Sequence, residues 1–467
     1  MYLSKLQIVA ALLLGGIFMC LPAFYNFYPL WFLETGAYLE AAYKYELSPS
    51  SNAFYAGFLH YSAVLESLWT TIFFQGFLIC TAIYYSFKCI YQPAQKWLFL
   101  FYTILASGAT LVSYHSSHIM PDIFTPIMIL SAGCLLFAPS LSKKDSIILG
   151  LLLVFSTSMH NAQWGIMGLL WLIWGGRLLI AKLKHQSIAA IANARGWAIV
   201  GGLTLVSYLL VSSIHYHLGG GFKATRGEDF YFFGRLCDYS LVQHALEEEE
   251  IEIEHPLIQH TWALYKGEDY LWGAGEHNLS GQGGWSPENE QFFEGLNQEV
   301  LSSTYAYKRY LIKSVEQSFV QLFNVEMQPQ ANVTADSIYR QSQRFRPTYG
   351  LLSYLARQRM QAYTQESISA KNLLQKSCLL LSIIILLGIH FLPPATIPTR
   401  QQYFSGFIIS AILVNAIVVV AFWGNNAHYQ SRVAWLLTLP AFYEAYSFLH
   451  RQFSEKKQEP EEYHSIS

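Results

Sequence analysis

The sequence has few charged residues. Asp, Glu, Lys and Arg make up 13% of its 467 residues, while hydrophobic residues make up 53% and aromatic residues 16%. Soluble domains usually carry roughly 25% charged residues, so a chain this poor in charge cannot cover an ordinary water-exposed surface. The composition therefore argues against a soluble globular protein and indicates a chain that lies largely in lipid.

The sequence also lacks a strong net charge and closely paired cysteines. The formal net charge is −2, so no overall positive field favours nucleic acid as a partner. None of the six cysteines forms a CxxC pair, which leaves no signal for a disulfide framework or a thiolate metal site. A glycine-rich phosphate loop and a Rossmann fingerprint are missing too, so we expect no nucleotide to bind.

Long apolar runs are abundant. A membrane span needs ~20 apolar residues, and charge-free windows meet or approach that length at residues 6–26, 67–87, 97–114, 123–142, 198–217, 377–392 and 403–423. The first run continues without charge to residue 33 and has no small-residue cleavage site before Asn26, which favours a retained span over a signal peptide. The window 146–176 is too long for one span, and the polar residues around His160 predict two helices with a turn there.

The distribution of basic residues predicts the topology. A last span at 433–450, interrupted by Pro440 and Glu444, completes a set of about ten spans. If the N-terminus is cytoplasmic, Lys and Arg collect in the inner loops, and the outer turns at 115–121 and 158–163 contain none. We therefore expect an integral, multi-pass membrane protein with both termini in the cytoplasm, in the inner (plasma) membrane of a bacterium.

These spans divide the chain into four parts. We predict an all-α polytopic membrane protein with about ten transmembrane helices and a mixed, mostly helical outer-loop domain. The parts are an N-terminal membrane module of about seven spans at 1–217 with a first outer loop at 27–60, an extracytoplasmic loop domain at 218–372, a C-terminal membrane module of about three spans at 373–450, and a cytoplasmic tail at 451–467.

Polar residues gather at the predicted outer turns. Glu34 follows the first span in the sequence LETGAYL (33–39), where Thr35 predicts the start of an interfacial helix. Glu34 is a candidate base facing a membrane substrate, or it simply caps that helix. Asp122 lies in MPDIFTP (120–126), between two spans; it is a second candidate acid, or the N-cap of the fourth span.

Three further groups accompany these carboxylates. His115 and His118 precede Asp122, and this His-x-x-His resembles a metal site in ligand type, although no further ligand has motif spacing. Other polar side chains occupy the third and last outer turns, namely His160, Asn161, Gln163, His428 and Arg432. An arginine there suits a phosphate, or it extends to lipid headgroups. All four clusters fall on one side of the membrane, which predicts one shared site.

The layout resembles the GT-C superfamily of membrane glycosyltransferases, which includes protein mannosyltransferases, aminoarabinose transferases and oligosaccharyltransferases. Those enzymes carry an acidic residue soon after the first span, followed by an interfacial helix, and often a second acid in the next outer loop. Glu34 and Asp122 match these two positions. Many members have Asp where this chain has Glu34, and residues 218–372 match no domain of that family. The MPDIFTP turn is also similar to one in bacterial membrane proteins of unassigned function.

The resemblance implies transfer of a sugar from a polyprenyl-phosphate donor to an acceptor at the outer face. Glu34 would be the general base, with Asp122 positioning the acceptor or sharing that role. Arg432 and His428 would bind the donor phosphate, and His118, His160 and Asn161 would complete the pocket. The partners are then the lipid donor, membrane lipids and an unknown acceptor. No cofactor is obligatory, and a divalent cation has no ligand motif to support it.

Other functions fit the same layout. A polysaccharide polymerase or ligase also has a large outer loop with Arg and His chemistry. A transporter or lipid flippase needs polar residues near mid-bilayer, whereas this chain places its charges at the outer helix ends. A non-catalytic envelope assembly subunit would use the loop domain as a docking surface.

Overall fold

The computed structural model is mostly helical in its described ranges. These are residues 4–32, 34–44, 47, 52–64, 67–93, 95–185, 194–225, 227–248, 267–272, 278–279, 284–328, 365–391 and 399–456. Within them no strand forms, and the single β-bridge joins Leu30 to His118. The predicted all-α fold is therefore confirmed for the described part of the chain.

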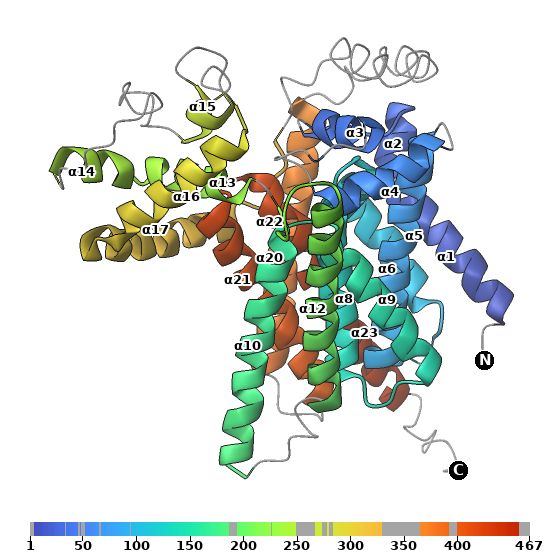
Figure 1. The fold of residues 1–467 in the computed structure, drawn as a ribbon. Helices are drawn as coiled ribbons and strands as arrows, with labels where there is room; N and C mark the ends of the chain where they lie inside the picture. Colours follow the sequence, from blue (N-terminus) through green and yellow to red (C-terminus); the bar gives the residue numbers. More distant parts are fainter. Residues whose placement is uncertain are drawn as a thin grey trace, which may run out of the picture.

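Long helices that run roughly side by side form the main body (Figure 1). They are α1 (Lys5–Met19), α5 (Trp69–Ser86) with its π-helical extension η1 (Phe87–Tyr91), α6 (Leu98–Ala109), α8 (Phe124–Phe137), α9 (Lys143–Ser158), α10 (Ala162–Leu183), α12 (Ala194–His217), α20 (Gln365–Phe391), α21 (Thr399–Phe422) and α23 (Thr438–Lys456). The buried apolar side chains of these helices, apart from those of α20, form one continuous core.

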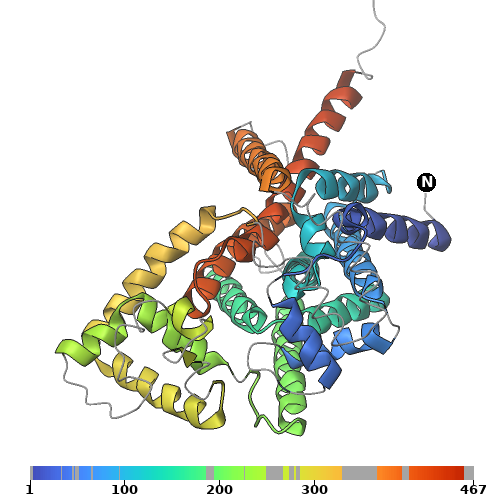
Figure 2. The ribbon, with the colours of Figure 1, turned by 90° about the horizontal axis from the view of Figure 1, so that it is seen from above.

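Shorter helices connect the long ones, and a second group of helices projects from the same end of the bundle (Figures 1 and 2). The connecting segments are α2 (Leu21–Asn26), α3 (Thr35–Lys44), α4 (Ala53–Val64), α7 (Val112–Ser117), η2 (Pro121–Ile123), α22 (Ala427–Ala434) and η6 (Trp435–Leu437). The projecting helices are α13 (Glu228–Asp238), α14 (Leu241–Glu248), α15 (Gly267–Trp272), α16 (Pro287–Ser302) and α17 (Thr304–Phe323). They have a small core of their own, built around Phe230, Phe233, Leu236, Tyr270, Phe293 and Leu296.

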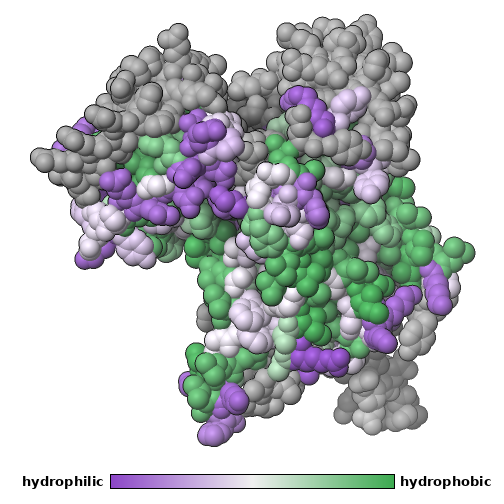
Figure 3. Space-filling model, in the orientation of Figure 1, coloured by the Kyte–Doolittle hydropathy of each residue, from purple (hydrophilic) through white to green (hydrophobic). Residues whose placement is uncertain are grey.

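Five of the described helices are long and apolar enough to cross a membrane. These segments are Trp69–Tyr91, Ala162–Leu183, Ala194–His217, Ile368–Gly388 and Arg400–Phe422. Three more apolar helices are shorter, at Lys5–Met19, Leu98–Ala109 and Pro121–Phe137. Apolar residues cover the bundle at mid-height, and hydrophilic residues mark its lower end (Figure 3). The chain is thus a multi-pass membrane protein, while a count of ten spans is not shown by helix length and composition.

The predicted break in the long apolar window at 146–176 is confirmed. Helix α9 ends at Ser158 and α10 begins at Ala162. The imidazole Nδ1 of His160 accepts the N–H of Ala162 at 3.0 Å. A polar side chain at this point satisfies one of the N–H groups that a helix start leaves without a partner, which explains why the chain turns here.

The predicted helix after the first span is also confirmed, because α3 begins at Thr35. Thr35 is fully buried, and its side chain connects the segment before α3 to the loop that follows α7. Its hydroxyl accepts the N–H of Phe32 at 2.8 Å and donates to the carbonyl of Ile119 at 3.1 Å. This contact holds the start of α3 against the loop that contains Asp122.

Candidate functional site

A backbone pairing brings together the first two of the loops that the sequence predicts to be outer. The N–H of Leu30 donates to the carbonyl of Ser117, and the N–H of Ile119 donates to the carbonyl of Leu30, both at 2.9 Å. Gln75 of α5 supports the second loop by donating to the carbonyls of Ser116 and His118. Glu34 and Asp122, each a few residues beyond this pairing, therefore face the same space.

That space is a cavity of about 110 Å³ between helix turns at one end of the bundle and the loop domain. Every predicted polar turn contributes to its wall. The lining residues are Glu34, Tyr38 and Asn52 from the first loop, Met120 and Asp122 from the second, His160 and Asn161 from the third, Tyr231, Gly234, Arg235, Asp238, Gly267 and Leu271 from the loop domain, and Trp423, Asn426, His428 and Tyr429 from the last turn. The expected convergence of the four clusters on one cavity is thus observed.

Glu34 presents an unsatisfied carboxylate oxygen to this cavity. Its Oε2 is buried and has no hydrogen-bond partner among the described residues. Burial, reinforced by the negative charge of Asp122, raises the pKa of Glu34 to about 7, while a backbone hydrogen bond acts in the opposite direction. A simple capping role leaves this free oxygen unexplained, whereas a group that exchanges protons near neutral pH needs one.

Asp122 forms a buried ion pair at the floor of the cavity. Its Oδ1 accepts from Nη1 of Arg432 at 2.7 Å, and Arg432 is 0% exposed. Nη2 of Arg432 donates to Oδ1 of Asn415 at 3.2 Å. The alternative that Asp122 caps the fourth span is wrong, because no side chain caps α8.

The alternative that Arg432 extends to lipid headgroups is also wrong, since the guanidinium is fully enclosed. Arg432 does not line the cavity either. The structure places it behind Asp122, where it neutralises and orients that carboxylate. Direct contact with a donor phosphate, as expected from the sequence, is not what this position offers.

Three of the other predicted residues reach the cavity wall. His428 is buried and His160 is partly exposed, and desolvation of the two rings lowers the pKa of His160 to about 3 and that of His428 to about 4. Both imidazoles are therefore neutral at physiological pH. Asn161 is held by Asn52, whose amide donates to its Oδ1 at 2.8 Å. Nδ1 of His428 lies 2.8 Å from Oδ1 of Asn426.

His118, in contrast, does not line the cavity. Its Nδ1 bonds the carbonyl of Tyr114 at 2.7 Å, and burial lowers its pKa to about 4. Its His-x-x-His partner, His115, bonds the hydroxyl of Ser431 at 3.0 Å. Across the residues that the structure describes, no group of three or more His, Cys, Asp or Glu could hold a metal ion. His115 thus connects α7 to α22, while the imidazole of His118 bonds back onto the end of α7.

The loop domain supplies residues that sequence reasoning did not assign to the site. Arg235 of α13 lines the cavity, pairs with Asp238 at 3.0 Å and donates to the carbonyl of Trp423 at 3.1 Å. Its Nε is buried and has no partner within the described ranges. A charged residue in an amphipathic helix with apolar neighbours is a sequence signal for a functional side chain at Arg235. The residues around it in the sequence do not indicate which surface of the protein the helix faces.

Aromatic rings form much of the remaining wall. Tyr38 and Tyr231 face the cavity from α3 and α13, and Trp423 and Tyr429 face it from the last outer turn. The cavity thus combines a carboxylate poised near neutral pH, a cation with a free N–H and flat apolar rings. Such a set suits proton removal from a hydroxyl and contact with the faces of sugar rings. No family model, curated protein or solved structure matches the chain, so the site is interpreted on its own geometry.

Proposed function

We propose that the protein is a membrane glycosyltransferase that moves a sugar from a polyprenyl-phosphate donor to an acceptor at the outer face of the membrane. The observation that carries this proposal is the environment of the Glu34 carboxyl group. Glu34 lines the cavity, its buried Oε2 has no hydrogen-bond partner among the described residues, and its pKa is raised to about 7. A general base works best when its pKa lies near the working pH. The GT-C layout of Glu34 and Asp122 supports the same assignment.

In the proposed reaction, Glu34 takes the proton of an acceptor hydroxyl. The acceptor oxygen then forms a bond to the anomeric carbon of the donor sugar. The bond between that carbon and the phosphate oxygen breaks, and its electron pair leaves with the phosphate. Asp122, oriented by Arg432, positions the acceptor, and the aromatic rings of the wall hold the sugar.

The charge that develops on the phosphate needs a donor of hydrogen bonds. Arg235 is the cation that lines the cavity and keeps one N–H without a partner among the described residues. His160, which also lines the wall, is neutral; its Nδ1 accepts from the N–H of Ala162, so its Nε2–H is left to donate to the same group. His428 does not donate there as the sequence predicts, because its single N–H is directed at Oδ1 of Asn426. We assign the phosphate to this side of the cavity. We also propose that the protein lies in the inner membrane of a bacterium, with both termini in the cytoplasm.

The substitution Glu34→Gln tests the proposal. Glutamine keeps the size of the side chain but cannot take the acceptor proton, so activity should fall by roughly 10²–10⁴-fold. A strain deleted for the gene is complemented with each variant, and the lipid-linked sugars that accumulate are measured by mass spectrometry. Glu40→Gln is the matched control, because Glu40 lies on α3, which begins directly after Glu34, and its 49% exposed side chain pairs with Lys44.

The expected result is accumulation of a lipid-linked sugar with Glu34→Gln and none with wild type or Glu40→Gln. Full complementation by Glu34→Gln, with the protein present at normal abundance, would remove the base from the mechanism. The docking and transport interpretations would then be preferred.

A further inference from the structure

Helix α17 carries an apolar stripe that nothing in the described structure covers. Ile312, Val315, Phe319 and Phe323 follow one another at spacings of three and four residues, so they share one face of the helix. Phe319 is 64% exposed and Phe323 is 76% exposed. Monomeric proteins in water rarely leave such large apolar side chains together on the surface.

The position of α17 indicates what covers this stripe. The helix lies across the direction of α10 and α12 in both ribbon views (Figures 1 and 2), at the end of the bundle that holds the cavity. It packs against α21, where the hydroxyl of Tyr310 donates to the carbonyl of Ala421 at 2.9 Å. An element placed in this way lies parallel to a membrane that the bundle crosses.

The stripe continues a surface that already faces lipid. On the membrane-crossing helix α21, Ile409, Leu413 and Ile417 are exposed at four-residue spacing. At its end, Phe422 is also exposed and packs on Phe232 of the loop domain. Because α17 joins α21 at this end, its apolar stripe meets the upper edge of the lipid-facing surface of the bundle.

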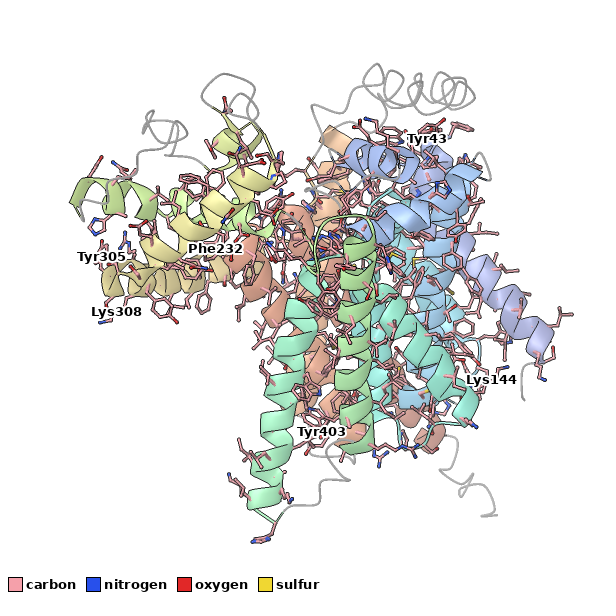
Figure 4. The ribbon with its side chains drawn as sticks, in the orientation of Figure 1. Tyr43, Lys144, Phe232, Tyr305, Lys308 and Tyr403 are labelled. Atoms are coloured by element: carbon pink, nitrogen blue, oxygen red, sulfur yellow. The ribbon has the colours of Figure 1, made fainter. Side chains whose placement is uncertain are left out.

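The charges on α17 match the same environment. Lys308 and Arg309 are exposed in its first half, next to the exposed ring of Tyr305. Figure 4 shows Tyr305 and Lys308 at the outer end of the projecting helices, with Lys308 pointing toward the lower side. Basic and aromatic residues beside an apolar face are typical of helices that lie among lipid headgroups.

We propose that α17 is an interfacial helix that docks the loop domain onto the membrane surface. Ile312, Val315, Phe319 and Phe323 enter the acyl region, while Lys308 and Arg309 contact lipid phosphates. This inference goes beyond glycosyl transfer and stands whether or not the protein is an enzyme.

The docked helix has a direct connection to the cavity wall. Gln321 donates to the carbonyl of Asn426 at 2.7 Å, and Asn324 donates to Asn425 at 3.1 Å. Both contacts fall on the turn between α21 and α22, which contributes Trp423 and Asn426 to the cavity. Membrane contact through α17 therefore holds this part of the wall in place.

Fluorescence quenching by labelled lipids tests the docking. Phe319→Cys is made in the full chain together with Cys378→Ser, since the other five cysteines are buried. An NBD dye is attached, and the protein is placed singly in nanodiscs of phosphatidylcholine and phosphatidylglycerol. A fraction of the phosphatidylcholine carries doxyl groups on its acyl chains. We expect quenching and a blue-shifted emission at position 319, and the same at Val315→Cys.

Glu288→Cys is the control site. Glu288 is exposed in the first turn of α16, at the end of that helix away from α17, and its label should not be quenched. If the labels at 319 and 315 are quenched no more than the label at 288, the proposal is overturned. In a separate sample, donor-labelled and acceptor-labelled copies are mixed in detergent; energy transfer between them at position 319, together with no quenching in the nanodiscs, would overturn it too, because the stripe would then contact a second copy of the chain.

Discussion

The carboxyl group of Glu34 has an environment that favours its neutral form. Burial raises its pKa from the ordinary 4.5 to about 7, and the nearby charge of Asp122 adds to this effect. The folded state therefore binds the proton of Glu34 more tightly than the unfolded chain does. Its contribution to stability is present below about pH 4.5 and is lost as the pH rises through about 7. At a pH above about 7, the folded state is therefore less stable than it would be with a neutral residue at this position, and the carboxylate is available as a base.

The pH dependence of activity follows from the same shift. A base must be deprotonated, so the transfer rate should rise as the pH increases through about 7 and then level off. Initial rates measured on purified protein over roughly pH 5 to 9 check this. The lining histidines, with pKa values lowered to about 3 and 4, do not titrate in that range. A rate that falls through pH 7 would instead identify Glu34 as an acid.

Arg432 should be the most sensitive basic residue for stability. Arg432→Gln leaves the buried carboxylate of Asp122 without its partner, which typically costs about 3–5 kcal/mol. Arg432→Lys keeps the charge but cannot reach both Asp122 and Asn415 with one planar group, so its loss is smaller. Thermal unfolding in detergent measures both losses.

A matched comparison is Lys88→Gln. Lys88 pairs with Asp145 at 2.6 Å, but its side chain is 40% exposed, and partly exposed pairs contribute little. Equal unfolding midpoints for Arg432→Gln and Lys88→Gln would mean that the buried pair does not stabilise the fold.

At the scale of elements, the turn between α21 and α22 requires a glycine. Gly424 has φ of +103°, a conformation that side chains with a Cβ rarely adopt. A Cβ there would lie 1.8 Å from Nη2 of Arg235. Nη2 of Arg235 donates to the carbonyl of Trp423. Because Gly424 has no side chain, Arg235 can approach this turn, and α13 packs over the cavity.

Gly424→Ala should therefore displace Arg235 and reduce activity more than stability. The complementation assay and the thermal unfolding midpoint, measured together, separate these effects. Gly202→Ala is the control, because an added Cβ in α12 meets nothing within 4 Å. If no lipid-linked sugar accumulates with Gly424→Ala, as with wild type, the Arg235 contact is dispensable.

At the scale of the whole molecule, the basic residues predict which end of the bundle is cytoplasmic. Cysteines introduced at Ser286, at the start of α16, and at Lys184, at the end of α10, are treated with a membrane-impermeant maleimide. We expect Ser286→Cys to react in intact cells and Lys184→Cys only after permeabilisation. Reaction of both from the same side would contradict the topology, and with it the placement of the cavity at the outer face.

The sequence by itself determined the helical class, the membrane setting and several element boundaries. Apolar runs, the polar break at His160 and the start of α3 at Thr35 depend on neighbouring residues, and hydropathy and capping report such local preferences. The proximity of Glu34 to Asp122 could also be predicted from the sequence, because short turns predicted on the same side of the membrane lie close to one another.

Only the tertiary structure decided which polar groups are partners. Asp122 and Arg432 are 310 residues apart in the chain, and their pairing depends on how α8 and α22 pack. The entry of Arg235 into the cavity depends in the same way on the closure of the loop domain over Gly424. Such contacts follow from the packing of distant helices against one another, which no local pattern of residues encodes.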